Sequence, residues 1–166
     1  MKNKVKVKFQ RRHPLATIPT KASDLAGGWD VSVTEIIKES EDFVICKLGF
    51  SLQPPTNYKV TLVPRSSLTK TYWILQNSPG LGDADYTGEY QFRFRAIPIG
   101  IEEKPESNKL PHDKYIGLAY PKFPYNIGDR IGQIYLEEVI PIEFIEVNEL
   151  KSTSRGEGGY GSTNNN

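Results

Sequence analysis

The sequence predicts an all-β fold, a sandwich or barrel of short strands, and three observations lead to this prediction. Five segments are rich in β-branched and aromatic residues, as strands usually are. Pro, Gly and Asn signals such as PPTN, NSPG and NIGD stand between these segments. No window carries an apolar stripe at helical spacing, and the best helical candidate is a short turn at 66–70. Many short strands joined by turns are typical of sandwiches and barrels.

The expected strands follow one another along the chain at 43–52, 57–64, 72–77, 89–97 and 130–147. A Pro- and charge-rich stretch at about 98–124 interrupts this rhythm and is expected to form an inserted loop or hairpin. From Lys151 onward the residues are small and polar, with Tyr160 the only core-type side chain. We therefore expect one β domain over 1–150, which carries the insert, and a flexible C-terminal arm over 151–166.

Length and charge exclude several classes of partner. A chain of 166 residues with 37% hydrophobic content is expected to form one domain with its own core. A net charge of +1 gives no reason to expect direct nucleic-acid or acidic-membrane binding. Six of the first twelve residues are Lys or Arg, but KVKVKF (4–9) alternates charged and apolar residues as a half-buried strand does. A solvated strand is therefore favoured over a nucleic-acid arm.

Membrane, secreted and zinc-binding proteins are also disfavoured. No apolar run reaches the roughly 18–20 residues that span a bilayer, and no signal-peptide core follows the basic start. Cys46 is the only cysteine and cannot form an internal disulfide, which fits a cytoplasmic location. His13 and His112 share no metal-ligand spacing with each other or with Cys46, so zinc is not expected.

Chemistry-bearing residues concentrate in NSPGLGDADYTGEY (77–90). Asp83 and Asp85 are two residues apart and would share one face of an extended segment. The glycines among them allow a tight turn or the close approach of a ligand. A hairpin loop with solvated carboxylates is the simpler interpretation, but it does not explain the large ring of Tyr86 among the carboxylates.

Two further segments are candidates for phosphate binding. LVPRSSL (62–68) places Arg65, Ser66 and Ser67 after a strand, where they could bind an anion or could form an ordinary helix N-cap with a surface arginine. GDRIGQI (128–134) is a weaker signal, because Gly-Asp is common in turns and Gln133 could simply pair across a sheet.

The C-terminal segment SRGEGGYGST (154–163) is either a frayed tail or a site that forms when a ligand binds. It offers a guanidinium, backbone N–H groups, hydroxyls and one aromatic ring, which are the groups that a nucleoside triphosphate requires. Base stacking contributes about 1–3 kcal/mol, whereas ordering the backbone costs about 1–2 kcal/mol per residue. Phosphate contacts would have to supply the difference.

Taken together, these segments resemble the five motifs of the homotrimeric deoxyuridine triphosphate nucleotidohydrolases, the dUTPases. LAGGWDVSV (25–33), with Asp30, resembles the first motif and PRSSL (64–68) the second. NSPGLGDADYTGEY resembles the third motif, GDRIGQI the fourth and RGEGGYGST the fifth. The motifs stand in the family order, and the resemblance covers nearly the whole chain.

The resemblance implies a jelly-roll β-barrel or sandwich subunit of the β-clip type, in a homotrimer with active sites between subunits. It also implies magnesium-dependent hydrolysis of dUTP to dUMP and pyrophosphate, which limits uracil incorporation into DNA and supplies dUMP. In this pattern Asp83 activates a water for attack on the α-phosphorus, and Arg155 stabilises charge on the phosphates. The residues expected to bind substrate are Arg65, Ser66, Ser67, Asn77, Gly80, Tyr86, Gln133, Tyr160, Gly161, Ser162 and Thr163.

The resemblance also implies individual roles. Tyr86 packs against the deoxyribose and leaves no room for a 2′-hydroxyl, while Asn77 and Gly80 belong to the loop that reads uracil. Gln133 holds a phosphate oxygen, and the tail of one subunit closes over a site formed by its neighbours. Magnesium is held mainly by the triphosphate and waters, so Asp30 is at most an outer-shell contributor, or a structural residue near the threefold axis.

The chain departs from the family pattern in several places without losing a proposed catalytic group. Gly82 stands where an aliphatic residue is usual, and its freedom could loosen the aim of Asp83. The other departures are Trp29, Thr87, Tyr160 and Asn164. The stretch at 98–124 is longer than a compact member needs. Some phage and mobile-element dUTPases carry inserts here, and some of these inserts contact regulatory proteins, so the stretch is either a decorated surface loop or a protein-contact site.

Two other functions stay open at this point. One is a dCTP deaminase-like enzyme, which shares the fold but needs a different arrangement of carboxylates. The other is a non-catalytic protein of the dUTPase fold that binds nucleotide or regulates a repressor. The Asp-x-Asp-Tyr segment and the arginine-containing glycine-rich tail favour the hydrolase.

Overall fold

The computed structural model describes residues 4–105 and 114–158 of the chain, and its regular structure is almost entirely β-strand. The all-β class predicted from the sequence is therefore confirmed. Within the described part of the chain the one helical segment is the short 3-10 turn η1 (Ser66–Lys70), at the place where the sequence predicted a helical turn.

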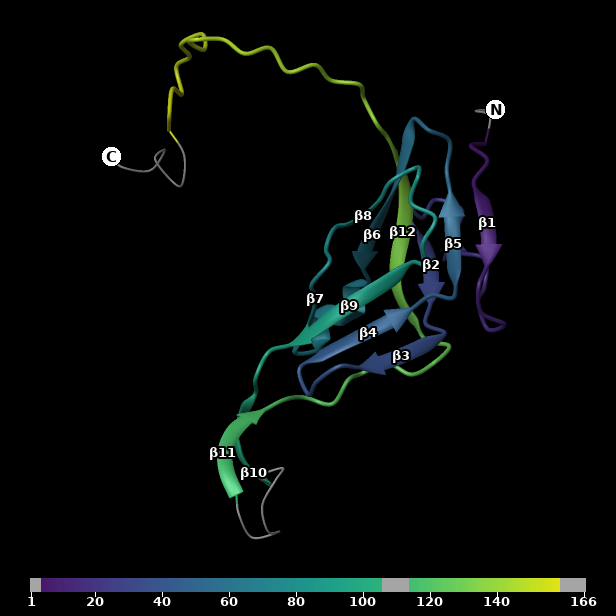
Figure 1. Ribbon diagram of the computed structural model, residues 1–166, viewed down its shortest axis with the longest axis vertical. Helices are drawn as coiled ribbons and strands as arrows, with labels where there is room; N and C mark the ends of the chain where they lie inside the picture. Colours follow the sequence, from purple (N-terminus) through teal and green to yellow (C-terminus); the bar gives the residue numbers. More distant parts are fainter. Residues whose placement is uncertain (1–3, 106–113, 159–166) are drawn as a thin grey trace.

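Two four-stranded antiparallel sheets form the body of the molecule (Figure 1). The first contains, in spatial order, β2 (Trp29–Ser32), β12 (Arg130–Glu138), β6 (Tyr58–Pro64) and β8 (Gly80–Gly82). The second contains β3 (Glu35–Lys38), β4 (Phe43–Lys47), β9 (Gln91–Ala96) and β7 (Trp73–Leu75). A separate ribbon pairs β1 (Lys8–Arg11) with β5 (Phe50–Gln53).

The hydrophobic core draws side chains from both sheets. Along β9, the fully buried Phe92 and Phe94 alternate with more exposed residues, as a half-buried strand requires. The first sheet comes close at Gly132 of β12, where an added Cβ would lie 2.2 Å from Cζ of Phe92. Cys46 is part of the same core, and burial raises the pKa of its thiol to about 12.

Strand boundaries differ from the predicted ones where a glycine or a missing neighbour ends the pairing. The predicted strand 43–52 is divided into β4 and β5 by Gly49, whose φ of 71° suits glycine. The N-terminal strand begins at Lys8 rather than at residue 4, opposite the end of β5. The predicted strand 130–147 ends at Glu138. The next residue, Val139, still donates to the carbonyl of Asn57 at 2.8 Å, and no further strand pairing is described after it.

Strands β2, β3 and β8 were missed by the sequence analysis. They have only three or four residues each, which is too short for an alternating pattern to show. Each is held by a longer neighbour: β2 by β12, β3 by β4 and β8 by β6.

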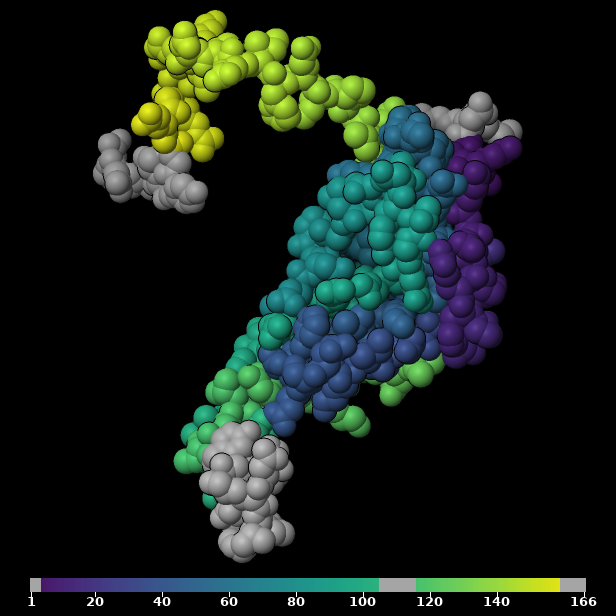
Figure 2. Space-filling model, in the orientation of Figure 1, coloured from purple at the N-terminus to yellow at the C-terminus, as the bar shows by residue number. Residues whose placement is uncertain are grey.

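Two segments project from opposite ends of the body (Figures 1 and 2). The hairpin of β10 (Gly100–Pro105) and β11 (Lys114–Ala119) lies within the stretch predicted as an insert. An ion pair between Lys104, near the end of β10, and Glu41 of the body connects the two. Residues 139–158 leave the end of β12 and run away from the sheets; the division into a domain and a flexible arm stays a prediction. Among the described residues no helix is long and apolar enough to cross a membrane.

Candidate active site

A cavity of about 190 Å³ opens beside β8 and gathers residues from the segment 77–90. Its lining consists of Leu62, Asn77, Gly80, Leu81, Tyr86, Tyr90 and Gln91. Three predicted substrate-binding residues, Asn77, Gly80 and Tyr86, therefore meet in one place. There is little room for a side chain at Gly80, because an added Cβ would lie only 3.1 Å from the carbonyl oxygen of Asn77 and from Cβ of Leu62.

The side chain of Asn77 ties this loop to β9. Its Nδ2 donates to the carbonyl of Gln91 at 3.1 Å, and its Oδ1 accepts a hydrogen bond from the backbone N–H of Arg93 at 2.9 Å. Both ends of the amide are therefore used by backbone groups. Asn77 shapes the loop in this structure, and one N–H and one oxygen lone pair of its amide are left for a ligand.

Asp83 and Tyr86 are presented by a tight turn that follows β8. The N–H of Tyr86 donates to the carbonyl of Asp83 at 3.1 Å, and the Tyr86 hydroxyl donates to the carbonyl of Glu89 at 3.0 Å. Gly88 is required beneath the ring, since a Cβ there would lie 2.5 Å from the Tyr86 hydroxyl oxygen. The carboxylate of Asp83 and that of Asp85 are both exposed to solvent.

The N-terminal ribbon holds this turn in place. Arg12 donates to Oγ of Ser51 at 2.9 Å and to the carbonyl of Thr87 at 2.8 Å. Ser51 in turn donates to the carbonyl of Gly88 at 2.8 Å. One of the basic residues near the N-terminus is therefore used to fix the loop that carries Asp83.

Gly82, whose freedom was expected to loosen Asp83, is restrained in this structure. It is the last residue of β8, pairs with Val60 of β6 and is buried. An added Cβ would lie 2.3 Å from the hydroxyl oxygen of Tyr90. The ring of Tyr90, the residue that precedes β9, thus fills the space that an aliphatic side chain at position 82 would take.

A buried carboxylate connects three of the predicted motifs. Asp30 of β2, with a side chain only 2% exposed, accepts a hydrogen bond from Nε2 of Gln133 at 3.0 Å and from Nη1 of Arg130 at 2.9 Å. Nε of Arg65 lies 3.7 Å from the same carboxylate, and Nη1 of Arg65 donates to the carbonyl of Arg130 at 3.2 Å. Two guanidinium groups against one carboxylate leave this cluster with a surplus of positive charge.

Arg130 is the member of this cluster that the sequence analysis missed. It lies within GDRIGQI, but its partner Asp30 is 100 residues away and meets it only through the pairing of β12 with β2. Ser66 and Ser67 begin η1 directly after Arg65, which stands at the cap position without a side-chain cap bond. The side chain of Arg65 is directed to Asp30 and Arg130 rather than left free on the surface.

The cavity and the Asp30 cluster belong to the same sheet. Asp30 of β2 pairs with Gln133 of β12, Gln133 pairs with Val63 of β6, and Leu62 of β6 pairs with Gly80 of β8. The strand order β2-β12-β6-β8 therefore lines up the first, fourth, second and third sequence motifs.

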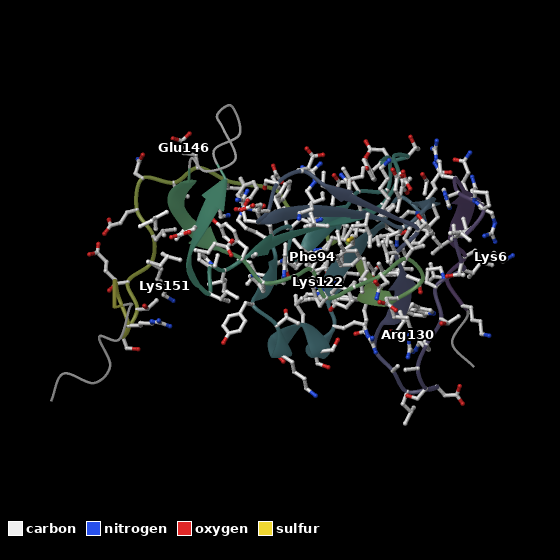
Figure 3. The ribbon with its side chains drawn as sticks, turned by 90° about the horizontal axis from the view of Figure 1, so that it is seen from below. Lys6, Phe94, Lys122, Arg130, Glu146 and Lys151 are labelled. Atoms are coloured by element: carbon white, nitrogen blue, oxygen red, sulfur yellow. The ribbon has the colours of Figure 1, made fainter. Side chains whose placement is uncertain are left out.

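Arg155 is not brought to the cavity by its own chain. It lies on the segment 139–158 that runs away from the body, and Figure 3 shows Glu146 and Lys151 of this segment at the end of the molecule opposite to Arg130. Nε of Arg155 donates to the carbonyl of Gly158 at 2.8 Å, in a local turn that Gly156 allows with a φ of 51°. The predicted ligand residues Tyr160, Gly161, Ser162 and Thr163 lie outside the described residues.

The described residues form no cluster of three or more His, Cys, Asp or Glu side chains that could hold a metal ion. Both oxygens of Asp30 already accept hydrogen bonds, and the exposed carboxylates of Asp83 and Asp85 stand on one turn. This donor set fits a magnesium ion that is held chiefly by phosphate oxygens and water better than one held by the protein.

Sequence comparisons with known proteins point to one family. The family model for dUTPase matches residues 15–97. A deoxyuridine 5′-triphosphate nucleotidohydrolase of Helicobacter pylori (strain ATCC 700392 / 26695) is 32% identical over 161 residues, 96% of this chain and 97% of that protein. The corresponding protein of Desulfotalea psychrophila is 31% identical over 151 residues, 89% of this chain and 87% of that protein.

Solved structures show the same fold. A dUTPase of Staphylococcus bacteriophage 80alpha with dUpNHpp has a TM-score of 0.71 at 19% identity and covers 95% of this chain and 98% of its own. The dUTPase of phage phi11 of S. aureus, described with a species-specific insert, has a TM-score of 0.65 at 20% identity and covers 89% and 99%. With four of its five sequence motifs on one sheet and relatives above 30% identity along nearly its whole length, this chain belongs to the dUTPase family.

Proposed function

We propose that this chain is a dUTP diphosphatase, which hydrolyses dUTP to dUMP and pyrophosphate. One observation carries the proposal: a cavity lined by Asn77, Gly80 and Tyr86 lies beside the turn that presents the exposed carboxylate of Asp83. The family membership supports the same substrate, because the relatives in Helicobacter and Desulfotalea carry the name of this activity. The buried lone thiol of Cys46 fits the reducing cytoplasm, where we place the enzyme.

In the proposed reaction Asp83 acts as a general base. Its carboxylate takes a proton from a water whose oxygen attacks the α-phosphorus of dUTP. The bond from the α-phosphorus to the oxygen that bridges it to the β-phosphate breaks, and that oxygen leaves with pyrophosphate. The bonds that Arg12 and Ser51 make to the turn keep the carboxylate aimed at the attacking water.

Recognition of the nucleoside is assigned to the cavity. The ring of Tyr86 covers the deoxyribose and excludes a 2′-hydroxyl. Because the Asn77 amide is bonded to β9, we assign the reading of uracil to backbone groups of the loop between Asn77 and Gly80, which that amide holds in shape. Discrimination by such fixed polar groups is strong, since a wrong base leaves them unpaired.

Recognition of the phosphates is assigned to Arg65, Ser66, Ser67 and Gln133. The buried carboxylate of Asp30 accepts a hydrogen bond from Gln133 and pairs with Arg65, which restrains both side chains. The surplus positive charge of the cluster suits the triphosphate. Magnesium, when bound, neutralises part of the phosphate charge; the phosphate oxygens and water would hold it, and Asp30 contributes at most at a distance. We assign Asp30 chiefly to the support of the phosphate-binding side chains.

The complete site is assigned to a homotrimer. Residues 139–150 expose a series of large apolar side chains, namely Val139, Ile140, Ile142, Phe144, Ile145, Val147 and Leu150. Phe144 is 90% exposed, and Figure 2 shows the segment apart from the body. An apolar strand-like segment of this kind is expected to pack on another copy of the chain. Packing of residues 139–150 on another subunit would carry Arg155 and residues 160–163 to a cavity of a neighbouring subunit.

The hairpin β10–β11 is the candidate for a second role as a protein-contact site. The register pairs Ile101 with Leu118 and Glu103 with Ile116, which places the three apolar side chains on one face of the ribbon, all exposed. Charged replacement of Ile101 and Ile116 should leave dUTP hydrolysis unchanged and abolish capture of a protein partner. Equal capture by both forms would leave the hairpin as a decorated surface loop.

Pyrophosphate release from dUTP, dCTP and UTP tests the proposed activity. Only dUTP should respond, and ammonia should appear from none of them; ammonia from dCTP would identify a deaminase instead. Asp83→Asn should abolish turnover while dUTP still binds, whereas Asp85→Asn, an equally exposed carboxylate two residues away, should retain most of it. Equal effects of the two changes would contradict the role of Asp83.

Two measurements test the assembly. The mass in solution should be that of three chains of 18.7 kDa. Deletion of 154–166 should lower turnover by far more than threefold, which is about 0.65 kcal/mol in activation free energy, without changing that mass. Turnover within threefold of the full chain would contradict a catalytic role for the tail.

A further inference from the structure

Tyr90 carries a buried hydroxyl that the proposed mechanism does not use. Its side chain is 2% exposed, and its hydroxyl oxygen has no hydrogen-bond partner among the described residues. A buried phenol hydroxyl without a partner is destabilising, so such a group usually has a water or a ligand to bond. Tyr90 is also one of the residues that line the cavity beside β8.

The position of the Tyr90 ring is fixed by its surroundings. Its backbone N–H donates to the carbonyl of Phe50, and its carbonyl accepts from the N–H of Leu48, both at 3.0 Å. Its ring lies 6.2 Å from that of Phe50 and meets the Tyr86 ring edge to face at 5.5 Å, measured between centroids. The ring is therefore held in a defined position beside the ring of Tyr86.

Gly82 shows where the hydroxyl points. An added Cβ at Gly82 would lie 2.3 Å from the Tyr90 hydroxyl oxygen and 2.6 Å from Cε1, so the tip of the ring occupies the space above the backbone next to Asp83. Gly82 has no left-handed φ that would require glycine, and room for this ring explains its identity. Burial, with smaller contributions from Tyr86 and Asp83, raises the pKa of Tyr90 to about 12, which keeps the hydroxyl protonated as a donor.

We propose that Tyr90 is a substrate-binding residue whose hydroxyl donates a hydrogen bond to the 3′-hydroxyl of the deoxyribose. This inference rests on the proposed function, which places the sugar against the ring of Tyr86. The sugar of a 2′-deoxynucleoside 5′-phosphate carries a single free hydroxyl, and that hydroxyl is a matching acceptor for a donor buried beside Tyr86. Gly82 and Tyr90 thus act as a pair: the glycine makes room for the donor beside the catalytic carboxylate.

Tyr125 supplies a matched control within the same chain. Its hydroxyl is also buried and without a partner among the described residues, but Tyr125 packs against Phe94 and Phe123 and does not line the cavity. Tyr90→Phe and Tyr125→Phe therefore remove the same chemical group, one from a residue that lines the cavity and one from a residue that does not.

The test measures binding of dUMP and of 2′,3′-dideoxyuridine monophosphate by calorimetry, after dUTP hydrolysis by the wild-type protein has been established. Tyr90→Phe should weaken dUMP binding about five- to tenfold, as expected for one neutral hydrogen bond, and leave binding of the dideoxy compound unchanged. Tyr125→Phe should change neither. The melting temperature of ligand-free Tyr90→Phe should equal or exceed that of the wild type, because the variant loses an unpaired buried group.

Two results would overturn the inference. Unchanged dUMP binding by Tyr90→Phe would mean that the hydroxyl bonds only a buried water, and an equal loss for both nucleotides would mean that it does not reach the 3′-hydroxyl. Failure of the wild-type protein to hydrolyse dUTP is a separate outcome, because it would remove the proposed function and this inference with it.

Discussion

The pairing of Gly82 with Tyr90 makes a quantitative prediction for Gly82→Ala. The new methyl group would lie 2.3 Å from the Tyr90 hydroxyl oxygen and 2.8 Å from Cζ, and a real Cβ is essentially never this close to another heavy atom. The ring is 2% exposed and packed against Phe50 and Tyr86, so it cannot turn aside without disturbing the cavity.

The expected cost follows from these contacts. Overpacking of this kind costs about 1–3 kcal/mol, and the lower backbone freedom of alanine in the unfolded chain returns about 0.4–1 kcal/mol. Gly82→Ala should therefore lower the free energy of unfolding by about 1–2 kcal/mol. Urea denaturation at a fixed protein concentration, followed through the fluorescence of the buried Trp73, measures this difference.

A double-mutant cycle separates the clash from other effects of the substitution. Tyr90→Leu alone should cost about 2–4 kcal/mol through the space it leaves, and part of that space would accept the alanine methyl. The loss of unfolding free energy in the double variant should then be smaller than the sum of the losses in the two single variants, by about 1 kcal/mol or more. Gly100→Ala is the control, because a Cβ there meets nothing within 4 Å. Additive effects within about 0.3–0.5 kcal/mol, or a stable Gly82→Ala, would refute the reasoning.

Three further predictions concern other parts of the fold. Asp30→Asn should cost about 1.5–3 kcal/mol in urea denaturation, because Arg130 loses a charged hydrogen-bond partner and Arg65 loses its nearby counter-charge. Gly132→Ala should cost about 1–3 kcal/mol in the same assay, since its Cβ would lie 2.2 Å from Cζ of the buried Phe92. A hydrogen bond from Thr61 is the main cause of the lowered pKa of Glu137. The stabilisation that ionised Glu137 provides is therefore present above its pKa in the unfolded chain, and it is lost as the pH falls through its pKa in the folded protein. Thr61→Val should reduce this part of the acid loss of stability, which melting temperatures between about pH 3 and pH 6 would show.

The strands could be predicted where their own residue pattern was sufficient. The prediction failed where pairing with another segment of the chain decides where a strand ends. The β-branched and aromatic residues of 130–147 predict one long strand, yet the pairing ends at Glu138 because β6, the partner strand, begins at Tyr58 opposite it. The apolar residues beyond it keep a strand-like pattern that no described part of the same chain satisfies. A local pattern cannot reveal which neighbour completes it, and here the neighbour is assigned to another subunit.

The candidate site divides in the same way. Asn77, Gly80 and Tyr86 could be predicted together because they lie in one short segment, whose loop brings them to one cavity. The bond between Arg130 and Asp30 depends on the register of β12 against β2, which the sequence does not state. Tyr90 was overlooked because the place of its ring depends on the absence of a side chain at Gly82, which the sequence does not connect with it.

The buried position of Cys46 makes this protein convenient for site-specific labelling. With its pKa raised to about 12, the only native thiol is almost wholly protonated at neutral pH and enclosed in the core, so a maleimide dye should leave it unmodified. A single thiol introduced by Ser154→Cys, on the exposed arm, would then carry the only fluorophore. Its anisotropy or energy transfer would report directly where the arm goes when nucleotide is added.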